Sequence, residues 1–225
     1  MRTVCIIPAL NEENTISRIV SEALKHCDTV LVVDDNSQDH TSELSHQTGA
    51  TVIRHILRLG TGGALSTGFR ASLKAGFEAF VTMDGDGQHT PSEIPTVLEP
   101  ILKNQADIVI GSRLLKRPRS MPLRKRIGNR ILSIATSFAS GTKITDSQSG
   151  FRAYRREVLE YAMHRARDYR WASEILLLAA KANFRIKEVP VTAIYLPKRQ
   201  RGADVKDGLK ILYSTIKRPK SVGFL

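Results

Sequence analysis

Short apolar runs alternate with helical patterns along the first half of the chain. Between the runs, apolar residues recur at helical spacing; Ile16, Ile19 and Val20, for example, share one helix face. Each run is too short for a helix and predicts a strand. The five predicted strands are Thr3–Pro8, Thr29–Val33, Thr51–Arg54, Ala79–Met83 and Ile108–Ile110. This alternation predicts an α/β fold with a mostly parallel, Rossmann-like sheet that helices cover on both faces.

Polar segments follow four of the predicted strands at the point where each strand ends. They are Pro8–Glu12, Asp34–Thr41, Asp84–Gln88 and Ser112–Arg113. In open parallel sheets, ligands bind in the crevice outside the carboxyl ends of the strands. A protein that only packs a core has no need to gather polar motifs along one edge, so the pattern predicts a binding site there.

The second half of the chain is less regular and contains two predicted amphipathic helices with basic flanks. Their apolar positions are Ile127, Ile131, Ile134 and Phe138 in the first helix, and Val205, Leu209, Leu212 and Ile216 in the second. A core helix with a solvated face is the more common origin of such a pattern, although basic amphipathic helices also lie in lipid interfaces. Between the helices, Ile186–Val191 and Thr192–Tyr195 predict two strands.

Residues 1–225 show no internal repeat and no linker, and we expect a single domain. No apolar run approaches the roughly 18 residues of a membrane-spanning helix. The apolar run at the N-terminus lacks a cleavage site, which favours a first strand over a signal peptide. Cys5 and Cys27 lack C-x-x-C spacing, so we expect buried, reduced thiols, which suit a cytosolic protein.

Positive charge is concentrated in one part of the sequence. The chain carries a net charge of +12, and residues 111–156 contain twelve Lys and Arg but a single acidic residue, Asp146. Such a segment attracts an anionic partner: a phosphate group, an acidic lipid surface or nucleic acid. A solvated basic face is the alternative, but the concentration of charge favours a functional role.

The segment Asp84-Gly85-Asp86-Gly87-Gln88 directly follows a predicted strand. Two carboxylates one residue apart can share a hard cation, and Mg²⁺ and Mn²⁺ prefer oxygen ligands of this kind, completed by phosphates and water. A polar turn that uses Asp and Gly for their backbone preferences is the structural alternative. An EF-hand is a poor match, because Pro95 occupies the twelfth position of the loop.

The segment Asp34–Thr41 also follows a strand, where an acidic side chain can bind a nucleoside. We expect Asp35 on the nucleotide and a structural role for Asp39, with Ser37 and Asp39 as candidate helix caps. A glycine-rich turn is predicted at Gly60–Gly63, before a helix that reaches about Ala75. This turn follows the third strand and not the first, so the sequence does not support a Rossmann cofactor site.

Together these segments resemble the family 2 glycosyltransferases, which have the GT-A fold, and among them the polyprenyl-phosphate sugar synthases of the dolichyl-phosphate mannose synthase type. The matching segments are Ile7–Glu12, Val33–Thr41, Gly60–Ala64, Met83–His89, Gly111–Arg113, Asp146–Arg152 and Glu188–Pro190. The resemblance reaches about Lys206. Several motifs in the same order are more specific than one D-x-D motif alone.

The resemblance implies a donor-binding half at about residues 1–113. Its nucleoside-binding residues are Pro8, Asn11, Glu12 and Asp35. In the D-x-D turn, which includes Gly85, Asp84 contacts the donor, and the predicted ligands of Mg²⁺ or Mn²⁺ are Asp86, Gln88 and Asp84. Arg113 lies near the phosphates, and Arg201 with Lys206 lies on a loop over the donor. Arg113 and Arg201, with the metal, would offset charge on the leaving diphosphate. Gly85 departs from the family, which often has alanine there.

The resemblance also implies an acceptor-binding half at about residues 114–225. An inverting enzyme would move a hexose from GDP-mannose or a UDP-hexose to a polyprenyl (dolichyl) phosphate. A phosphomonoester is already ionised, so positioning suffices without a general base. The candidate ligands of that phosphate are Arg124, Arg126, Arg130 and Arg152, because guanidinium groups suit phosphate oxygens. The lipid tail would lie on the helix of Ile127 and Phe138, and we expect a cytoplasmic protein bound peripherally to the cytoplasmic face of a membrane.

Three alternatives remain open. A family 2 enzyme with a hydroxyl acceptor would need a base, Asp146 or Glu174, but Arg167–Trp171 matches only the end of the Q-x-x-R-W signature of polysaccharide synthases. A nucleic-acid binder would use the positive charge but needs no strand-end carboxylates, and aromatic content is only 6%. A nucleotidyltransferase would have a glycine-rich loop where this chain has Ala9–Asn11. We expect no zinc, and His89 to be a support or turn residue.

Overall fold

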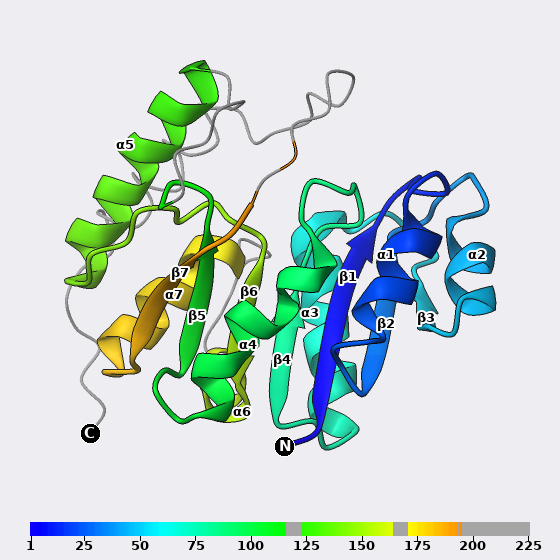
Figure 1. The fold of residues 1–225 in the computed structure, drawn as a ribbon, viewed down its shortest axis with the longest axis horizontal. Helices are drawn as coiled ribbons and strands as arrows, with labels where there is room; N and C mark the ends of the chain where they lie inside the picture. Colours follow the sequence, from blue (N-terminus) through cyan, green and yellow to red (C-terminus); the bar gives the residue numbers. More distant parts are fainter. Residues whose placement is uncertain (116–122, 164–170, 193, 195–225) are drawn as a thin grey trace.

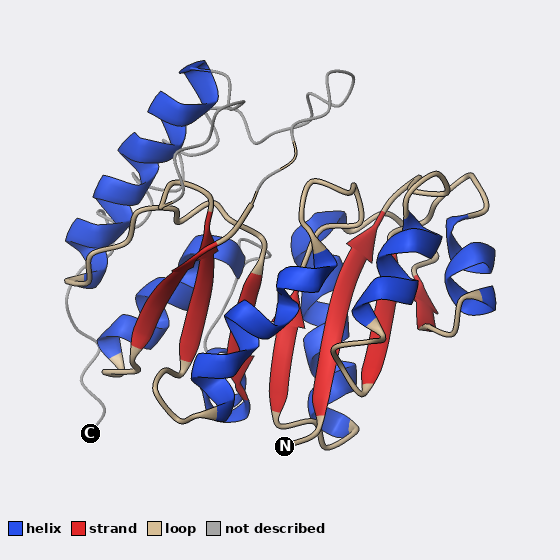
Figure 2. Ribbon diagram, in the orientation of Figure 1, coloured by secondary structure: helices blue, strands red, loops and turns tan. Residues whose placement is uncertain are grey.

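The computed structural model describes residues 1–115, 123–163, 171–192 and 194. In this part of the chain one sheet has the strand order β3-β2-β1-β4-β6-β5-β7 (Figures 1 and 2). Only β6 runs antiparallel to its neighbours, β4 and β5. The strands are β1 (Thr3–Ala9), β2 (Thr29–Asp34), β3 (Thr51–Arg54), β4 (Ala79–Thr82), β5 (Ile108–Ser112), β6 (Arg152–Arg155) and β7 (Ile186–Pro190). The predicted α/β fold with a mostly parallel sheet is confirmed.

Helices cover both faces of the sheet (Figure 1). They are α1 (Ile16–Ala23), α2 (Thr41–Gln47), α3 (Gly60–Lys74), α4 (Ile94–Leu102, after a 3-10 turn at Pro91–Glu93), α5 (Leu123–Ser140), α6 (Arg156–Met163) and α7 (Trp171–Lys181). Because successive strand residues point to opposite faces, β1 serves two core layers. Its Cys5 and Ile7 pack in the layer of α1 and α4, and its Val4 and Ile6 in the layer of α3, α6 and α7.

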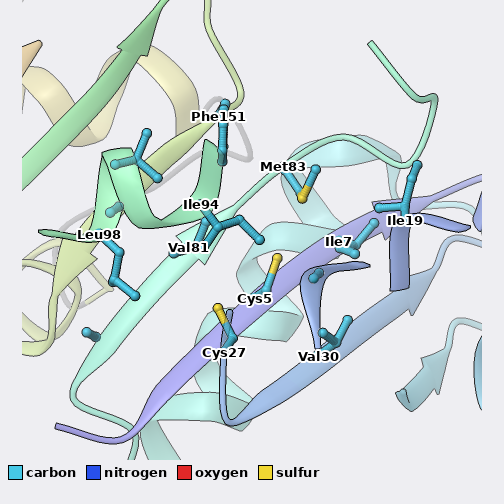
Figure 3. Close-up of a cluster of buried hydrophobic side chains, with 14 of the residues drawn as sticks. Cys5, Ile7, Ile19, Cys27, Val30, Val81, Met83, Ile94, Leu98 and Phe151 are labelled. Atoms are coloured by element: carbon cyan, nitrogen blue, oxygen red, sulfur yellow. The ribbon is translucent and has the colours of Figure 1, made fainter. Parts of the chain in front are cut away.

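Both cysteines are free and buried in the layer of α1 and α4 (Figure 3). Burial raises the pKa of the Cys27 thiol to about 12 and that of Cys5 well above its ordinary value. Neither residue therefore carries an appreciable fraction of the reactive thiolate at neutral pH. The prediction of buried, reduced thiols is confirmed.

The five strands predicted in the first half are confirmed to within two residues at their ends. The glycine-rich turn predicted at Gly60–Gly63 is wrong, because α3 begins at Gly60. The carboxylate of Asp35 accepts the backbone N–H groups of Leu59 and Gly60 at 2.8 and 2.7 Å. These are orphan donors at the start of the helix, and satisfying them allows α3 to begin there.

Two segments of the second half differ from the prediction or lie outside the structure. The strand predicted at Thr192–Tyr195 is not formed at Thr192 or Ile194. Thr192 instead donates its N–H and hydroxyl to the carboxylate of Glu93, at 2.8 and 2.9 Å, and the Ile194 N–H donates to the Gln88 carbonyl at 2.9 Å. These bonds hold the segment that follows β7 against the segment that follows β4. The helix predicted at 205–216 lies outside the described residues.

Candidate active site at the carboxyl edge of the sheet

The polar segments predicted from the sequence gather at the carboxyl edge of the sheet (Figure 1). The ends of β1 and β2 are level, because Ala9 pairs with Asp34 and the Asp35 N–H donates to the Ala9 carbonyl at 2.9 Å. The Met83 N–H donates to the Ile6 carbonyl at 3.2 Å and brings the end of β4 beside β1. Segments far apart in sequence therefore share one site region.

The loops after β1 and β2 are bonded to each other. Asn11 and Asn36 both adopt left-handed backbone conformations, with φ of 56° and 66°, which asparagine tolerates better than most residues. The Asn11 N–H donates to Ser37 Oγ at 2.9 Å, the Gln38 N–H donates to Asn11 Oδ1 at 2.8 Å, and the Glu12 N–H donates to Thr41 Oγ1 at 2.7 Å. The structure thus brings Asn11 and Glu12 beside the segment that contains Asp35.

Asp39 and Ser37 stabilise this pair of loops. Asp39 Oδ1 accepts the Thr41 N–H at 3.0 Å, and its Oδ2 accepts the Glu13 N–H at 3.2 Å, which confirms the predicted structural role of Asp39. The prediction of Ser37 as a helix cap is wrong. Its N–H donates to Asp34 Oδ1 at 3.0 Å, and its hydroxyl donates to the same oxygen. Asp34 is fully buried and fixes the loop directly after β2.

Asp35 is 3% exposed and accepts three hydrogen bonds. Besides the two N–H groups at the start of α3, His55 Nδ1 lies 2.8 Å from Oδ1. Desolvation acts to raise the pKa of Asp35, but the hydrogen bonds from His55, Leu59 and Gly60 outweigh it and hold the pKa below its usual value. Asp35 is therefore an ionised anchor between β2 and α3, a function that the sequence did not indicate.

Asp84 lies in the turn after β4 with its side chain 43% exposed. The buried His89 places Nε2 3.5 Å from Asp84 Oδ2 and stacks at a tilt on Phe151, with ring centroids 5.3 Å apart. Desolvation acts to raise the pKa of Asp84, but the His89 hydrogen bond and the charges of Arg113 and Arg152 hold it below its usual value. The carboxylate is therefore ionised and surrounded by basic groups.

Asp86 and Gln88 lie on the same turn and contact each other. The Gln88 N–H donates to Asp86 Oδ1 at 3.0 Å, and the Gln88 side-chain amide donates to Asp86 Oδ2. Across the described residues, no three His, Cys, Asp or Glu side chains gather into a metal site. The oxygens of Asp84, Asp86 and Gln88 suit Mg²⁺ or Mn²⁺, which take part of their ligand shell from substrate phosphates and water. The turn therefore fits a metal bound together with a substrate.

Two glycines define the space around the D-x-D turn. A Cβ atom added at Gly85 would meet Ile7 Cγ2 at 3.4 Å and Glu12 Cγ at 3.5 Å, so there is room for the alanine that the family often has. A Cβ atom at Gly150 would lie 2.9 Å from Asp84 Oδ2 and 3.1 Å from Oδ1. Gly150 therefore lets the loop before β6 pack directly against the Asp84 carboxylate.

Arg113 follows β5 and is held by the buried Asp146. Its Nε and one Nη lie 2.7 and 2.8 Å from the two Asp146 oxygens, and its N–H donates to Oδ2 at 3.0 Å. Glu188 of β7 in turn accepts the backbone N–H groups of Thr145 and Asp146 at 2.9 and 3.0 Å. The sequence predicted Arg113 near the donor phosphates. It did not predict that Asp146 and Glu188 hold this side chain.

The Arg152 side chain is buried and is not open to a lipid phosphate. This side chain is 1% exposed on β6, and its Nε and one Nη donate to the carbonyls of Ser149 and Ser147 at 2.7 and 2.6 Å. The prediction of an acceptor ligand is therefore corrected: Arg152 stabilises the loop that carries Asp146 and Gly150. The reason is burial, because the carbonyls occupy donors that a phosphate would need.

Helix α5 exposes its large apolar side chains to solvent instead of burying them. Ile127, Ile131, Ile134 and Phe138 are 52%, 49%, 61% and 91% exposed. Its buried positions are instead small and polar, among them Ser133 and Thr136, and Ser133 Oγ accepts the Ser147 N–H at 3.0 Å. The predicted helix is confirmed, but the core-helix alternative is wrong for this face. No helix in the described part of the chain is long and apolar enough to span a membrane.

The remaining predicted site residues are placed in part. Pro8 lies within β1, and Arg124 and Arg126 lie in the first turn of α5. Arg130 is exposed on the same helix, one residue before Ile131. Arg201 and Lys206 lie outside the described residues. The structure therefore leaves the prediction for the loop over the donor untested.

The comparison with solved structures concerns the fold. The chain superposes on glucosyl-3-phosphoglycerate synthase from Mycobacterium tuberculosis, in complex with Mn²⁺, uridine diphosphate and phosphoglyceric acid, with a TM-score of 0.75. The two share 20% identity over 98% of this chain and 80% of the other, so the likeness concerns the fold. The chain has the GT-A fold, with the D-x-D turn at the carboxyl edge of its sheet.

The family is shown by sequence. The family model described as glycosyl transferase family 2 matches residues 4–162. The UDP-N-acetylglucosamine--dolichyl-phosphate N-acetylglucosaminyltransferase of Methanococcus voltae is 36% identical, over 92% of each chain. The polyprenol monophosphomannose synthase of Mycolicibacterium smegmatis is 33% identical, over 93% of this chain and 83% of the relative. The protein belongs to glycosyl transferase family 2 and is a glycosyltransferase. The nucleic-acid-binding and nucleotidyltransferase alternatives are set aside.

Proposed function

We propose that this enzyme transfers a sugar from a nucleotide sugar to a polyprenyl phosphate at the cytoplasmic face of a membrane. The observation that carries the proposal is the exposed apolar face of α5, which lies within the segment that contains twelve basic residues and one acidic residue. Two relatives named for dolichyl-phosphate and polyprenol acceptors support it. The sequence identity to both relatives is about a third, and the two are named for different sugars, so the relatives do not determine which donor this enzyme uses.

Asp84, Asp86 and Gln88 would hold Mg²⁺ or Mn²⁺ together with the donor diphosphate. When bound, the metal would neutralise negative charge on the diphosphate as it leaves. The left-handed Asn11 and the adjoining Glu12 would line the nucleoside with Pro8 and Asp35. Arg113, fixed by Asp146, would contact the phosphates through its guanidinium, and Arg201 and Lys206 are proposed to close over them. All of these groups act by positioning and electrostatic stabilisation.

An ionised phosphate acceptor needs no general base, and the site offers no free one at Asp146. Both oxygens of that carboxylate accept hydrogen bonds from Arg113, and the residue is fully buried. A hydroxyl acceptor would need a base within hydrogen-bond reach of its proton. This arrangement favours a phosphomonoester, bound by Arg130 with Arg124 and Arg126, over a glycan hydroxyl.

The exposed face of α5 would contact the lipid. Complete burial of an isoleucine or phenylalanine side chain stabilises by roughly 1.5–3 kcal/mol, so four such residues, part of whose surface is already covered, supply several kcal/mol at most. That range suits reversible, peripheral binding, strengthened by basic residues near an acidic lipid surface at about 1 kcal/mol each. The face would hold the enzyme at the membrane and receive the acceptor tail.

A comparison of acceptors with long and short lipid tails tests this proposal. Label from a nucleotide sugar would be followed into long-chain polyprenyl phosphate in vesicles and into a short, water-soluble prenyl phosphate. We expect the wild type to use the long acceptor, and Ile134→Ser/Phe138→Ser to lose about tenfold or more of this activity because the apolar face is weakened. Activity on the short acceptor should change little, because neither residue belongs to the D-x-D turn.

Leu102→Ser is the matched control. Leu102 is 47% exposed at the end of α4, which precedes β5 and so ends at the opposite edge of the sheet. It should leave both activities intact. Equal loss on long and short acceptors in the α5 variant would contradict a lipid-contacting role, and labelling of glycan hydroxyls in place of either phosphate would move the acceptor to the hydroxyl class.

A further inference from the structure

The Asp35 carboxylate has one acceptor position that its described hydrogen bonds do not fill. A carboxylate has two acceptor positions on each oxygen. His55 Nδ1 and the Leu59 N–H lie 2.8 and 2.8 Å from Oδ1 and fill that oxygen, whereas Oδ2 accepts only the Gly60 N–H, at 2.7 Å. Within the described contacts of Asp35, the free position is therefore on Oδ2.

The protonation of this group follows from its surroundings. Because its hydrogen bonds hold the pKa of Asp35 below the usual value, the carboxylate is ionised at neutral pH and can only accept. His55 Nδ1 must therefore carry the hydrogen of their shared bond. His55 is fixed at its other nitrogen, since Nε2 lies 2.9 Å from the Thr67 hydroxyl on α3, and its backbone N–H donates to the Asp34 carbonyl at 2.9 Å. The ring cannot turn away without breaking its bonds to Asp35 and Thr67, and the backbone bond fixes the residue that carries it.

Uracil and guanine, the bases of the two candidate donors, differ in the hydrogen bonds that they would make to this carboxylate. Uracil has a single ring N–H between two carbonyl groups, and one acceptor position satisfies it. Guanine presents two adjacent N–H donors, which pair best with both oxygens of a carboxylate. With Oδ1 filled, one guanine donor would be left without a partner, and an unpaired buried polar group is costly.

We propose that His55, by filling Oδ1 of Asp35, makes this site select a uridine diphosphate sugar over a guanosine diphosphate sugar. The inference rests on the proposed function, in which the nucleoside lies at the ends of β1 and β2. His55 is a specificity-determining residue that acts through Asp35, and the donor is a UDP-sugar.

Binding of the nucleoside diphosphates alone tests the selection without a sugar or an acceptor. Titration calorimetry with UDP and with GDP, each in the presence of Mn²⁺, should give the wild type at least tenfold tighter binding of UDP. His55→Phe removes the donor to Oδ1 and should reduce the ratio of the two dissociation constants by threefold or more, chiefly by improving GDP binding. His55→Asn keeps an N–H near the position of Nδ1 and should restore much of the preference.

His46→Phe is the matched control, because His46 is exposed on α2 and the substitution is the same. It should leave the ratio unchanged. Equal or tighter binding of GDP by the wild type would overturn the proposed selection of UDP over GDP, but it would still agree with an enzyme that binds a nucleotide. An unchanged ratio in a folded His55→Phe protein would overturn the role of His55. Binding of neither nucleotide by folded wild type would overturn the proposed function together with this inference.

Discussion

Arg113 and Asp146 form a two-pronged ion pair in which Nε and one Nη of the guanidinium lie 2.7 and 2.8 Å from the two carboxylate oxygens. Asp146 is fully buried and the Arg113 side chain is 14% exposed. The pair joins the end of β5 to the loop before β6, and Glu188 fixes that loop from β7 through its N–H groups. An arginine held in this way is preorganised for a phosphate and costs little to position.

The two residues should be coupled energetically. Arg113→Ala, Asp146→Ala and the double variant would be compared by urea unfolding. Each single variant leaves a buried or half-buried charge without its partner, so each should lower the free energy of unfolding by about 3–5 kcal/mol, and the double variant by much less than the sum. Additivity within about 0.5 kcal/mol would show that the pair is not coupled.

Gly150 and Gly85 give a matched pair of glycine-to-alanine substitutions. At Gly150 the new methyl group would lie 2.9 Å from Asp84 Oδ2, so the Asp84 carboxylate must shift from its present position. We expect Gly150→Ala to reduce kcat by about tenfold or more with little change in melting temperature. Gly85→Ala, whose methyl group meets its neighbours at 3.4 Å or more, should retain most activity. Equal activity of the two variants would show that the Asp84 position is not critical.

Binding to vesicles should depend on α5 and on salt. Co-sedimentation with anionic vesicles should retain the wild type at low salt and lose part of it at high salt, because the basic residues are screened while the apolar contact remains. Ile134→Ser/Phe138→Ser should bind weakly at either salt concentration, whereas Leu102→Ser should behave as the wild type. Full retention of the α5 variant would contradict membrane contact through this face.

Stability should fall in acid partly through Asp107. Hydrogen bonds from the Arg185 guanidinium, at 2.8 and 3.0 Å, lower the pKa of Asp107 in the folded protein. Its stabilising contribution is therefore complete above the unfolded pKa of about 4 and is lost as pH falls through the lower folded value. Asp107→Asn should lower the melting temperature at pH 7 but very little at pH 2–3. An equal loss at both pH values would contradict this linkage.

The sequence predicted the strands of the first half because their apolar runs are short and end at polar motifs. It did not predict β6, because Arg152–Arg155 has a charged residue at each end and no apolar run. The same limit applies to Arg152, which was expected at a phosphate but donates to two carbonyls of its own loop. A buried arginine and an exposed one look alike in sequence, and only the tertiary contacts separate them.

The helix at 123–140 shows what periodicity can and cannot establish. The spacing of Ile127, Ile131, Ile134 and Phe138 predicted the helix correctly, but not which face the protein covers. In the structure the small residues Ser133 and Thr136 are buried and the large apolar ones are not. The contacts of Asp35 could not be predicted from sequence either, since its hydrogen bonds come from a histidine and two backbone groups 20 to 25 residues away.

Metal-dependent transfer to a lipid phosphate is the most direct test of the proposed activity. Purified enzyme would receive polyprenyl phosphate, Mn²⁺ and labelled UDP-glucose, UDP-N-acetylglucosamine or GDP-mannose, and label would be extracted into the organic phase. Label from a uridine donor should enter the lipid and should disappear with EDTA and with Asp86→Ala, but persist with Glu99→Ala, a change to an exposed carboxylate on α4. Label that never enters the lipid phase, or transfer that survives EDTA and Asp86→Ala, would contradict the proposed activity.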